Sequence, residues 1–249
     1  MYYIYNIIYS KLSTKNTKHQ QHKPQSQLST KRIVYQIPYQ ILELFIKITD
    51  DNTAQLFETA AYFCGKRNSG NNTMLLNHLV IPQQAQKKDQ YIITGWNHIE
   101  YIEKHKLEIG CMIHTHPQHS LFLSVPDLIA HCALQMANNS SISIVYAPMC
   151  MNLSTKFDIS PRRHPRFKQK IINKKLSTKN NNQSEILSNC FGFYCMTDKF
   201  MTNYGKKPNR KAFYKYLKRR PGKAYVNANN FEILFDDVTV YNKDLREKK

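Results

Sequence analysis

Two histidines and an aspartate stand at a spacing that suits a metal site. His114 and His116 form an H-x-H pair, and Ser124 and Asp127 follow after seven residues as S-x-x-D. The mostly apolar run over 108–113 predicts a buried strand that leads into the pair. Side chains two apart on a strand share a face, so both imidazoles would lie side by side at its end.

Asp127 adds a carboxylate to the two imidazoles. It directly precedes a run over 128–136 that predicts a helix. Zinc used for catalysis typically has three protein ligands and an open fourth position for water. Such an ion lowers the pKa of its bound water to about 7. The residue types therefore predict a hydrolytic zinc site at His114, His116 and Asp127.

Each part of this pattern also has a purely structural interpretation. An H-x-H pair alone is weak evidence for a metal. Ser124 and Asp127 fit a capping box at the start of the predicted helix, which does not exclude ligation because the first turn faces the end of the preceding strand. His131 lies one turn beyond Asp127 on the same helix face, so it is either a rival ligand or a packed histidine.

The whole pattern resembles the signature of the JAMM (MPN-plus) zinc metalloproteases, which cut isopeptide bonds to ubiquitin and its relatives. Further matches narrow the resemblance to the AMSH-like (STAM-binding-protein-like) deubiquitinases of lysine-63-linked chains. These matches are Asn52-Thr53-Ala54, Glu58-Thr59, Cys64-Gly65-Lys66, His78–Pro82, His114–Pro117, Phe122-Leu123-Ser124, Asp127-Leu128, His131-Cys132, Gln135-Met136, Val238–Val240 and Asp244–Arg246. The resemblance is firm over residues 35–160 and looser over 185–246.

This resemblance implies an α/β protein with the MPN fold, a curved mixed β-sheet sandwiched by helices. Glu58 would be the general base that takes a proton from the metal-bound water and gives it to the leaving amine. Without the resemblance, Glu58 reads as an ordinary exposed helix residue. Ser124 would donate a hydrogen bond to the developing oxyanion. One catalytic zinc ion and a polyubiquitin substrate complete the implied chemistry.

The same resemblance carries expectations about partners and location. It implies the endosomal sorting (ESCRT) machinery as a partner, and a cytoplasmic, endosome-associated protein. The net charge of +19 is spread over both tails and the 160–223 region, which favours biased composition as its cause, with attraction to ubiquitin chains or peripheral contact with a membrane as a secondary use. We expect no transmembrane segment, because the apolar stretch over 1–9 is far too short to cross a bilayer, and it lacks the features of a signal peptide.

The chain departs from the AMSH-like pattern at that branch's second, structural zinc. Ile129 stands where the branch has its first histidine ligand, and Gly192-Phe193-Tyr194 lacks the histidines of a G-F-H-P-H run. Cys190 alone cannot hold a metal, so we expect this second zinc to be absent. The segment 94–98 also differs from the branch's first ubiquitin-recognition insertion. Cleavage chemistry is therefore better supported than linkage choice.

Composition divides the chain into a tail and one domain. Residues 1–33 form a basic tail whose Lys, Gln, Ser and Thr content predicts disorder. Residues 34–249 form the predicted MPN domain, with a basic low-complexity insertion near 160–184. The tetrapeptide Leu-Ser-Thr-Lys occurs four times at irregular intervals, which favours low-complexity drift. Six cysteines without a C-x-x-C pair suit a reducing compartment, where buried cysteines act as small hydrophobes.

Apolar spacing predicts the elements around the site. A helix after Pro38 would bury Ile41, Leu44, Phe45 and Ile48 at i, i+3, i+4 and i+7. The remaining expected elements are strands over 60–64 and 74–82 joined as a hairpin, a polar loop over 83–90, a helix over 96–106, a helix over 127–137 and a strand over 141–146.

Two other functions compete with hydrolysis. A non-catalytic MPN module, structural or ubiquitin-binding, usually lacks a metal ligand or the base, whereas His114, His116, Asp127 and Glu58 are all present. A single-stranded nucleic acid groove would explain only the basic, aromatic stretch over 199–223. Nucleic acid is therefore not expected as a specific partner.

Overall fold

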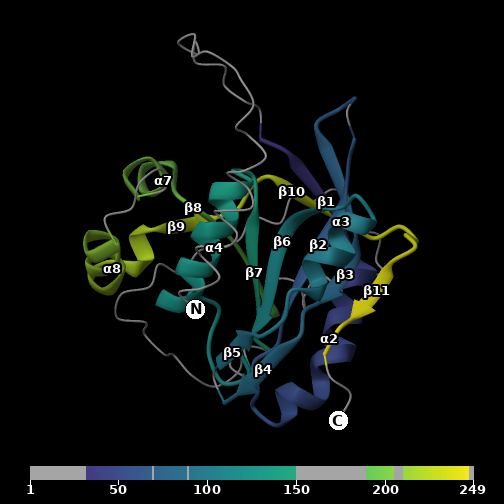
Figure 1. Cartoon of the computed structure of the whole chain (residues 1–249), viewed down its shortest axis with the longest axis horizontal. Helices are drawn as coiled ribbons and strands as arrows, with labels where there is room; N and C mark the ends of the chain where they lie inside the picture. Colours follow the sequence, from purple (N-terminus) through teal and green to yellow (C-terminus); the bar gives the residue numbers. More distant parts are fainter. Residues whose placement is uncertain (1–31, 69, 89, 150–188, 205–209, 247–249) are drawn as a thin grey trace.

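The computed structural model describes residues 32–68, 70–88, 90–149, 189–204 and 210–246. The predicted tail over 1–33, apart from its last two residues, and the predicted insertion near 160–184 lie outside these residues. Within them, the chain alternates helices and strands (Figure 1). The strands are β1 (Val34–Pro38), β2 (Ala60–Asn68), β3 (Thr73–Ile81), β4 (Gln84–Lys87), β5 (Gln90–Ile93), β6 (Glu108–Thr115), β7 (Ile142–Tyr146), β8 (Phe191–Met196), β9 (Tyr225–Asn227), β10 (Phe231–Leu234) and β11 (Tyr241–Asp244). The helices are α2 (Tyr39–Ala54), α3 (Asn97–Lys104), α4 (Val125–Ala137), α7 (Asp198–Tyr204) and α8 (Arg210–Arg219), with a short 3-10 turn over Pro221–Lys223.

Nine of these strands form one mixed sheet in the order β10-β1-β3-β2-β6-β7-β8-β9, with β11 beside the second half of β3. The β2–β3 hairpin is antiparallel, as predicted, while β6 and β7 run parallel and are linked through α4. The strand β2 is irregular in both of its pairings. Its register shifts between Cys64 and Lys66 against β3, and between Phe63 and Cys64 against β6. Gly65 is required at this bulge, because a Cβ there would lie 1.9 Å from the carbonyl oxygen of Leu75.

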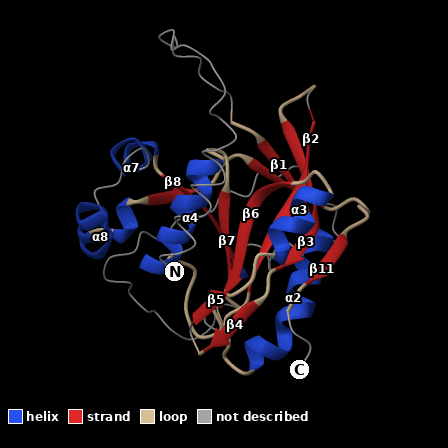
Figure 2. Cartoon of the chain, viewed as in Figure 1, coloured by secondary structure: helices blue, strands red, loops and turns tan. Residues whose placement is uncertain are grey.

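Helices cover both faces of the sheet (Figure 2). Alternate residues of β2 divide between the faces: Phe63 packs in the cluster that contains Phe45 of α2, and Cys64 packs with Ile102 of α3. The second face continues beneath α4, where Leu128 belongs to a cluster that includes buried side chains of β7 and β8. The predicted α/β class and the curved mixed sheet sandwiched by helices are confirmed.

Most of the expected elements are present with shifted ends. The helix after Pro38 buries Ile41 and Phe45 fully and Leu44 and Ile48 in part. The strand β1 before this helix was not predicted. The polar loop expected over 83–90 is wrong, because these residues contribute to the separate two-stranded hairpin β4–β5.

The segments Val238–Val240 and Asp244–Arg246, which resemble the family's terminal strand, lie on either side of β11. This strand runs over Tyr241–Asp244 and overlaps the second segment at Asp244. All five cysteines in the described residues are buried and form no disulfide, among them Cys64, Cys111 and Cys132, which were expected to act as small hydrophobes. No helix in the described part of the chain is long and apolar enough to cross a membrane.

The end of α3 is a strained turn that offers a clean test of the fold. Lys106 has φ 53° and follows the C-cap residue of α3. Its N–H bonds to the carbonyl of Glu103, and the N–H of Leu107 bonds to the carbonyl of Ile102. This is a Schellman motif, in which a left-handed residue normally is glycine. A left-handed conformation costs a residue with a Cβ about 1–2 kcal/mol.

We therefore expect Lys106→Gly to raise the free energy of unfolding by about 1 kcal/mol, because glycine removes the Cβ clash. Lys106 is exposed, so little packing is lost. Urea denaturation measures the change, and Lys106→Ala, which keeps a Cβ, should match the parent. Equal midpoints for the glycine and alanine variants would contradict the assigned strain.

A buried histidine in the first turn of α3 makes stability depend on pH. The ring of His98 stacks with the rings of Tyr62 and Trp96, at centroid distances of 5.3 and 6.1 Å. Burial lowers the pKa of His98 to about 4, against an opposing hydrogen bond to the backbone of Gly95. The unfolded chain binds a proton near pH 6.5. The stability that neutral His98 contributes is therefore fully present above pH 6.5 and decreases as the pH falls towards 4.

Replacing His98 by phenylalanine keeps a flat ring in the stack and removes the titration. We expect His98→Phe to lose less stability than the parent between pH 6.5 and 4, with a difference of about 1–3 kcal/mol at pH 4.5. Thermal unfolding of both proteins across this range measures the slopes. Parallel curves would show that another group carries the pH dependence.

Candidate metal centre and its surroundings

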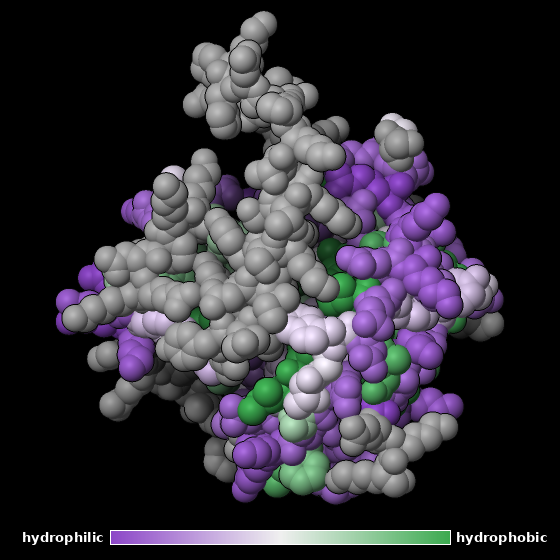
Figure 3. Space-filling view, viewed as in Figure 1, coloured by the Kyte–Doolittle hydropathy of each residue, from purple (hydrophilic) through white to green (hydrophobic). Residues whose placement is uncertain are grey.

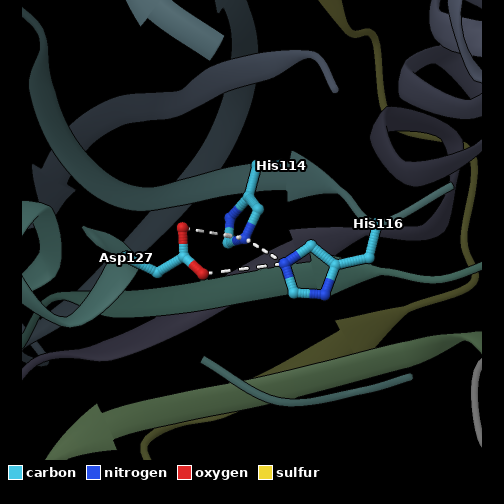
Figure 4. Close-up of side chains that lie close together, drawn as sticks. All are labelled: His114, His116 and Asp127. Atoms are coloured by element: carbon cyan, nitrogen blue, oxygen red, sulfur yellow. Dashed lines mark hydrogen bonds and ion pairs between the residues drawn. The ribbon is translucent and has the colours of Figure 1, made fainter. Parts of the chain in front are cut away.

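The three predicted ligands come together at one end of β6 (Figure 4). His114 is the second-to-last residue of β6, and His116 follows directly after the strand ends. Asp127 reaches them from the first turn of α4. All three side chains are buried, at 0%, 2% and 5% exposure. Among the described residues, they form the single group of three or more His, Cys, Asp or Glu side chains suited to hold a metal.

The spacing of the ligand atoms suits a tetrahedral ion. The two Nε2 atoms of His114 and His116 lie 3.1 Å apart. His114 Nε2 is 3.4 Å from Asp127 Oδ1, and His116 Nε2 is 3.6 Å from Asp127 Oδ2. Ligands about 2.0–2.1 Å from zinc at tetrahedral angles stand roughly 3.3 Å from one another. The two imidazole nitrogens stand near this spacing and each faces a different oxygen of the Asp127 carboxylate, so the donor set fits zinc.

A hydrogen bond sets the orientation of one imidazole. His116 Nδ1 lies 3.1 Å from the carbonyl oxygen of Ser120, which can only accept. The proton of neutral His116 is therefore on Nδ1, and its Nε2 lone pair faces His114 and Asp127. Metal-binding histidines commonly donate their second nitrogen in this way. The buried Nδ1 of His114 has no partner of this kind in the described part of the chain.

The start of α4 fixes the carboxylate. Ser124 is the N-cap, and its Oγ accepts from the N–H of Asp127 at 3.3 Å. In return, Asp127 Oδ2 accepts from the N–H of Ser124 at 2.8 Å. The predicted capping box is confirmed, and it leaves the hydroxyl hydrogen of Ser124 able to donate elsewhere. Although burial alone would raise the pKa of Asp127, the imidazoles of His114 and His116 hold it well below its usual range.

His131 lies outside the ligand group, which agrees with its interpretation as a packed histidine. It is fully buried on α4, where the side chain of Gln135, one turn further along the helix, is a polar neighbour of its ring. Burial lowers the pKa of His131 to about 3, so its ring is neutral. The structure therefore favours the packed histidine over the rival ligand.

Glu58 is buried, at 7% exposure, in the loop that joins α2 to β2. The interpretation as an exposed helix residue is wrong, because α2 ends at Ala54. The chain turns there through Leu56, at φ 64°, and then enters β2, whose first residue Ala60 pairs with His114. This pairing brings the Glu58 segment beside the histidines.

Tyr91 is a site residue that the sequence analysis missed. Its ring lies 5.9 Å from the ring of His114, tilted by 41°. Burial raises the pKa of Tyr91 well above its usual value, and the nearby carboxylates of Asp127 and Glu58 raise it further. Tyr91 therefore has both carboxylates in its surroundings. The sequence did hold a signal for this strand, the apolar run Tyr91-Ile92-Ile93, which favours a strand. The polar residues before the run concealed it.

The chain is similar to several known proteins over a little less than half of its length. The chain is 35% identical over 118 residues to the AMSH-like protease sst2 of Schizosaccharomyces pombe, which covers 47% of this chain and 26% of that protein. It is 32% identical over 114 residues to the STAM-binding protein-like A of Danio rerio, covering 45% of this chain and 27% of that protein. A probable ubiquitin thioesterase of Dictyostelium discoideum, DG1039, is 30% identical over 112 residues, covering 44% and 15%.

No family model matches the chain. The chain spans about a quarter of the length of the first curated relatives it matches. Within the matched part, these relatives confirm the resemblance to the AMSH-like branch of the JAMM family, and with it the MPN type of α/β fold.

The ligand assignment leads to a direct test of metal content. We expect purified protein to hold one zinc ion per chain, and His114→Ala to lose it, because two remaining ligands hold zinc poorly. His119→Ala is the matched control, since the ring of His119 lies 6.0 Å from that of His116 but outside the ligand group. Elemental analysis after dialysis provides the measurement. Two equivalents in the parent, or retention in His114→Ala, would refute the site.

Proposed function

We propose that the chain is a zinc-dependent deubiquitinase that hydrolyses isopeptide bonds in polyubiquitin. The main support is the buried group of His114, His116 and Asp127, whose ligand atoms stand at the spacing of a three-ligand zinc site. The relatives named as AMSH-like protease and as probable ubiquitin thioesterase support the substrate class. Lysine-63-linked chains are the linkage that the AMSH-like resemblance favours.

The residues divide the work of hydrolysis between them. A zinc ion held by His114, His116 and Asp127 would supply a Lewis acid and would make water a stronger nucleophile near neutral pH. Glu58 accepts the proton of the attacking water and passes it to the leaving lysine amine. The hydroxyl of Ser124 donates to the oxyanion that develops on the scissile carbonyl. Burial of the ligands excludes bulk water, which strengthens each of these interactions.

The wider assignments follow from the same relatives. We infer that residues 34–249 form one MPN domain, and that residues 1–33 and the insertion near 160–184 are not needed for the chemistry. The STAM-binding names of several relatives support a partner in endosomal sorting and a cytoplasmic, endosome-associated location. The exposed basic residues of α8, where the surface is hydrophilic (Figure 3), suit peripheral contact with an anionic membrane.

The role of Glu58 separates an enzyme from a non-catalytic module. Glu58→Gln keeps the size of the side chain but cannot take a proton, so cleavage of lysine-63-linked di-ubiquitin should fall by about 10²–10⁴. Zinc should remain at one equivalent, because Glu58 is not a ligand. His114→Ala should lose both metal and cleavage, so the two variants differ in metal content alone.

A panel of di-ubiquitin linkages, assayed with and without a chelator, gives the accompanying controls. Chelation should abolish cleavage and added zinc should restore it. Undiminished cleavage by Glu58→Gln would remove Glu58 from the mechanism. A parent protein that binds zinc and ubiquitin but never cleaves would establish the module instead.

A further inference from the structure

The carboxylate of Glu58 has no helix or strand of its own to hold it. Phe57 makes only an isolated bridge, Glu58 and Thr59 have no regular structure, and β2 begins at Ala60. A general base must nevertheless stay within hydrogen-bond reach of the proton that it takes. The backbone of Glu58 is therefore positioned through the residues on either side of it.

The hydroxyl of Thr59, the residue that follows Glu58, accepts hydrogen bonds from two side-chain amides. Gln86 of β4 donates through Nε2 to Thr59 Oγ1 at 2.6 Å, and Asn52 of α2 donates through Nδ2 to the same oxygen at 3.1 Å. Thr59 is fully buried, so this oxygen cannot turn to water instead. The residue next to Glu58 is thus tied to the hairpin and to α2 at once.

A second glutamine of the hairpin, Gln84, makes the hydrogen bonds to Ala60 that a neighbouring strand would otherwise make. The register of β2 with β3, continued by two residues, places Pro82 opposite Ala60, and proline has no N–H to donate. The amide of Gln84 takes over: its Oε1 accepts from the N–H of Ala60, and its Nε2 donates to the carbonyl of Ala60, both at 2.9 Å. A side chain therefore provides the two bonds that a strand would have made.

The opposite side of the loop is held by β6. The N–H of Thr59 donates to Thr115 Oγ1 at 2.9 Å, and the N–H of Thr115 donates to the carbonyl of Thr59 at 3.0 Å. Phe57 meets Lys88 of the hairpin in its isolated bridge. The Glu58 segment is therefore fixed between the β4–β5 hairpin and the strand that carries His114. In Figure 1 the hairpin lies beside the lower ends of the central strands.

We propose that Gln86 and Gln84 of the β4–β5 hairpin are positioning residues that hold Glu58 through Thr59 and Ala60. The inference rests on the proposed function, since it assigns a means of holding the base. The same hairpin carries Tyr91 against His114, so one element sets both the base and a wall of the metal centre. A small displacement of a catalytic group, about 1 Å, can cost roughly 10² in rate.

Gln86→Met tests this proposal, because methionine keeps the length of the side chain but has no donor. We expect kcat for di-ubiquitin to fall by about 10–100-fold, with KM and zinc content unchanged, because only the base is displaced. Thr59→Val, which removes the shared acceptor, should lose a similar factor, and Thr59→Ser should regain it. Gln90→Met, an exposed position on β5, is the matched control and should cleave as the parent does.

A double-mutant cycle shows whether Gln86 acts through Glu58. In a Glu58→Gln background, Gln86→Met should cause no further loss, because the base that it positions is already absent. The same loss in both backgrounds, or a rise in KM at constant kcat, would overturn the proposal. A melting temperature lowered in Gln86→Met and Gln90→Met alike, with equal activities, would also overturn it.

Hydrogen exchange tests the hairpin contacts without any activity. The amide of Ala60 has Gln84 Oε1 as its acceptor, so Gln84→Met should speed its exchange while the amides in the middle of β2 stay protected. Unchanged exchange at Ala60 would refute the hairpin contacts. A parent with these contacts but no cleavage would instead refute the proposed function.

Discussion

The pairing of β2 with β6 is the constraint on which the rest of the site depends. It sets Ala60 opposite His114, and the reciprocal bonds of Thr59 and Thr115 extend it by one further step. A slip of one residue would turn every side chain of a strand to the other face of the sheet. Because Phe63 and Ile113 are fully buried on the α2 face, such a slip would expose the core. Hydrophobic burial therefore holds His114 on the face that meets α4.

The start of α4 performs two tasks with one carboxylate. Asp127 accepts from the N–H of Ser124 and faces both imidazoles, so the same carboxylate caps the helix and completes the candidate ligand set. A charge this deeply buried would be costly alone, and it is stabilised by these partners. The position of the third ligand therefore comes from regular helix geometry, which is more reproducible than that of a loop.

The sequence predicted those parts of the site whose causes are local. Strand alternation places His114 and His116 on one side, and the capping pattern of Ser124 and Asp127 locates the start of a helix; both depend on neighbouring residues only. The burial of Glu58 could not be read in this way, because partners far along the chain enforce it. Taken by itself, the Glu58 segment resembles the end of an exposed helix.

The β4–β5 hairpin could not be predicted from neighbouring residues either, because its side chains bond to a distant segment. Gln84 and Gln86 have a composition typical of a loop, yet both point their amides at the backbone or hydroxyl of a distant segment. Polar residues used as substitutes for strand partners leave no periodic apolar signal. Tyr91 was hidden by its neighbours for this reason, although its own run favours a strand.

The distribution of the site along the chain has a consequence for folding. The three candidate ligands all fall within residues 114–127, whereas Thr59 and Thr115 are 56 positions apart. Closing a short loop costs less entropy than closing a long one, and non-local contacts form more slowly. A partly folded chain can therefore bring the three candidate ligands together before Glu58 reaches them. Glu58 joins the group only when the long-range pairing of β2 with β6 is complete, so the last part of the candidate site to form is the one that depends on the finished sheet.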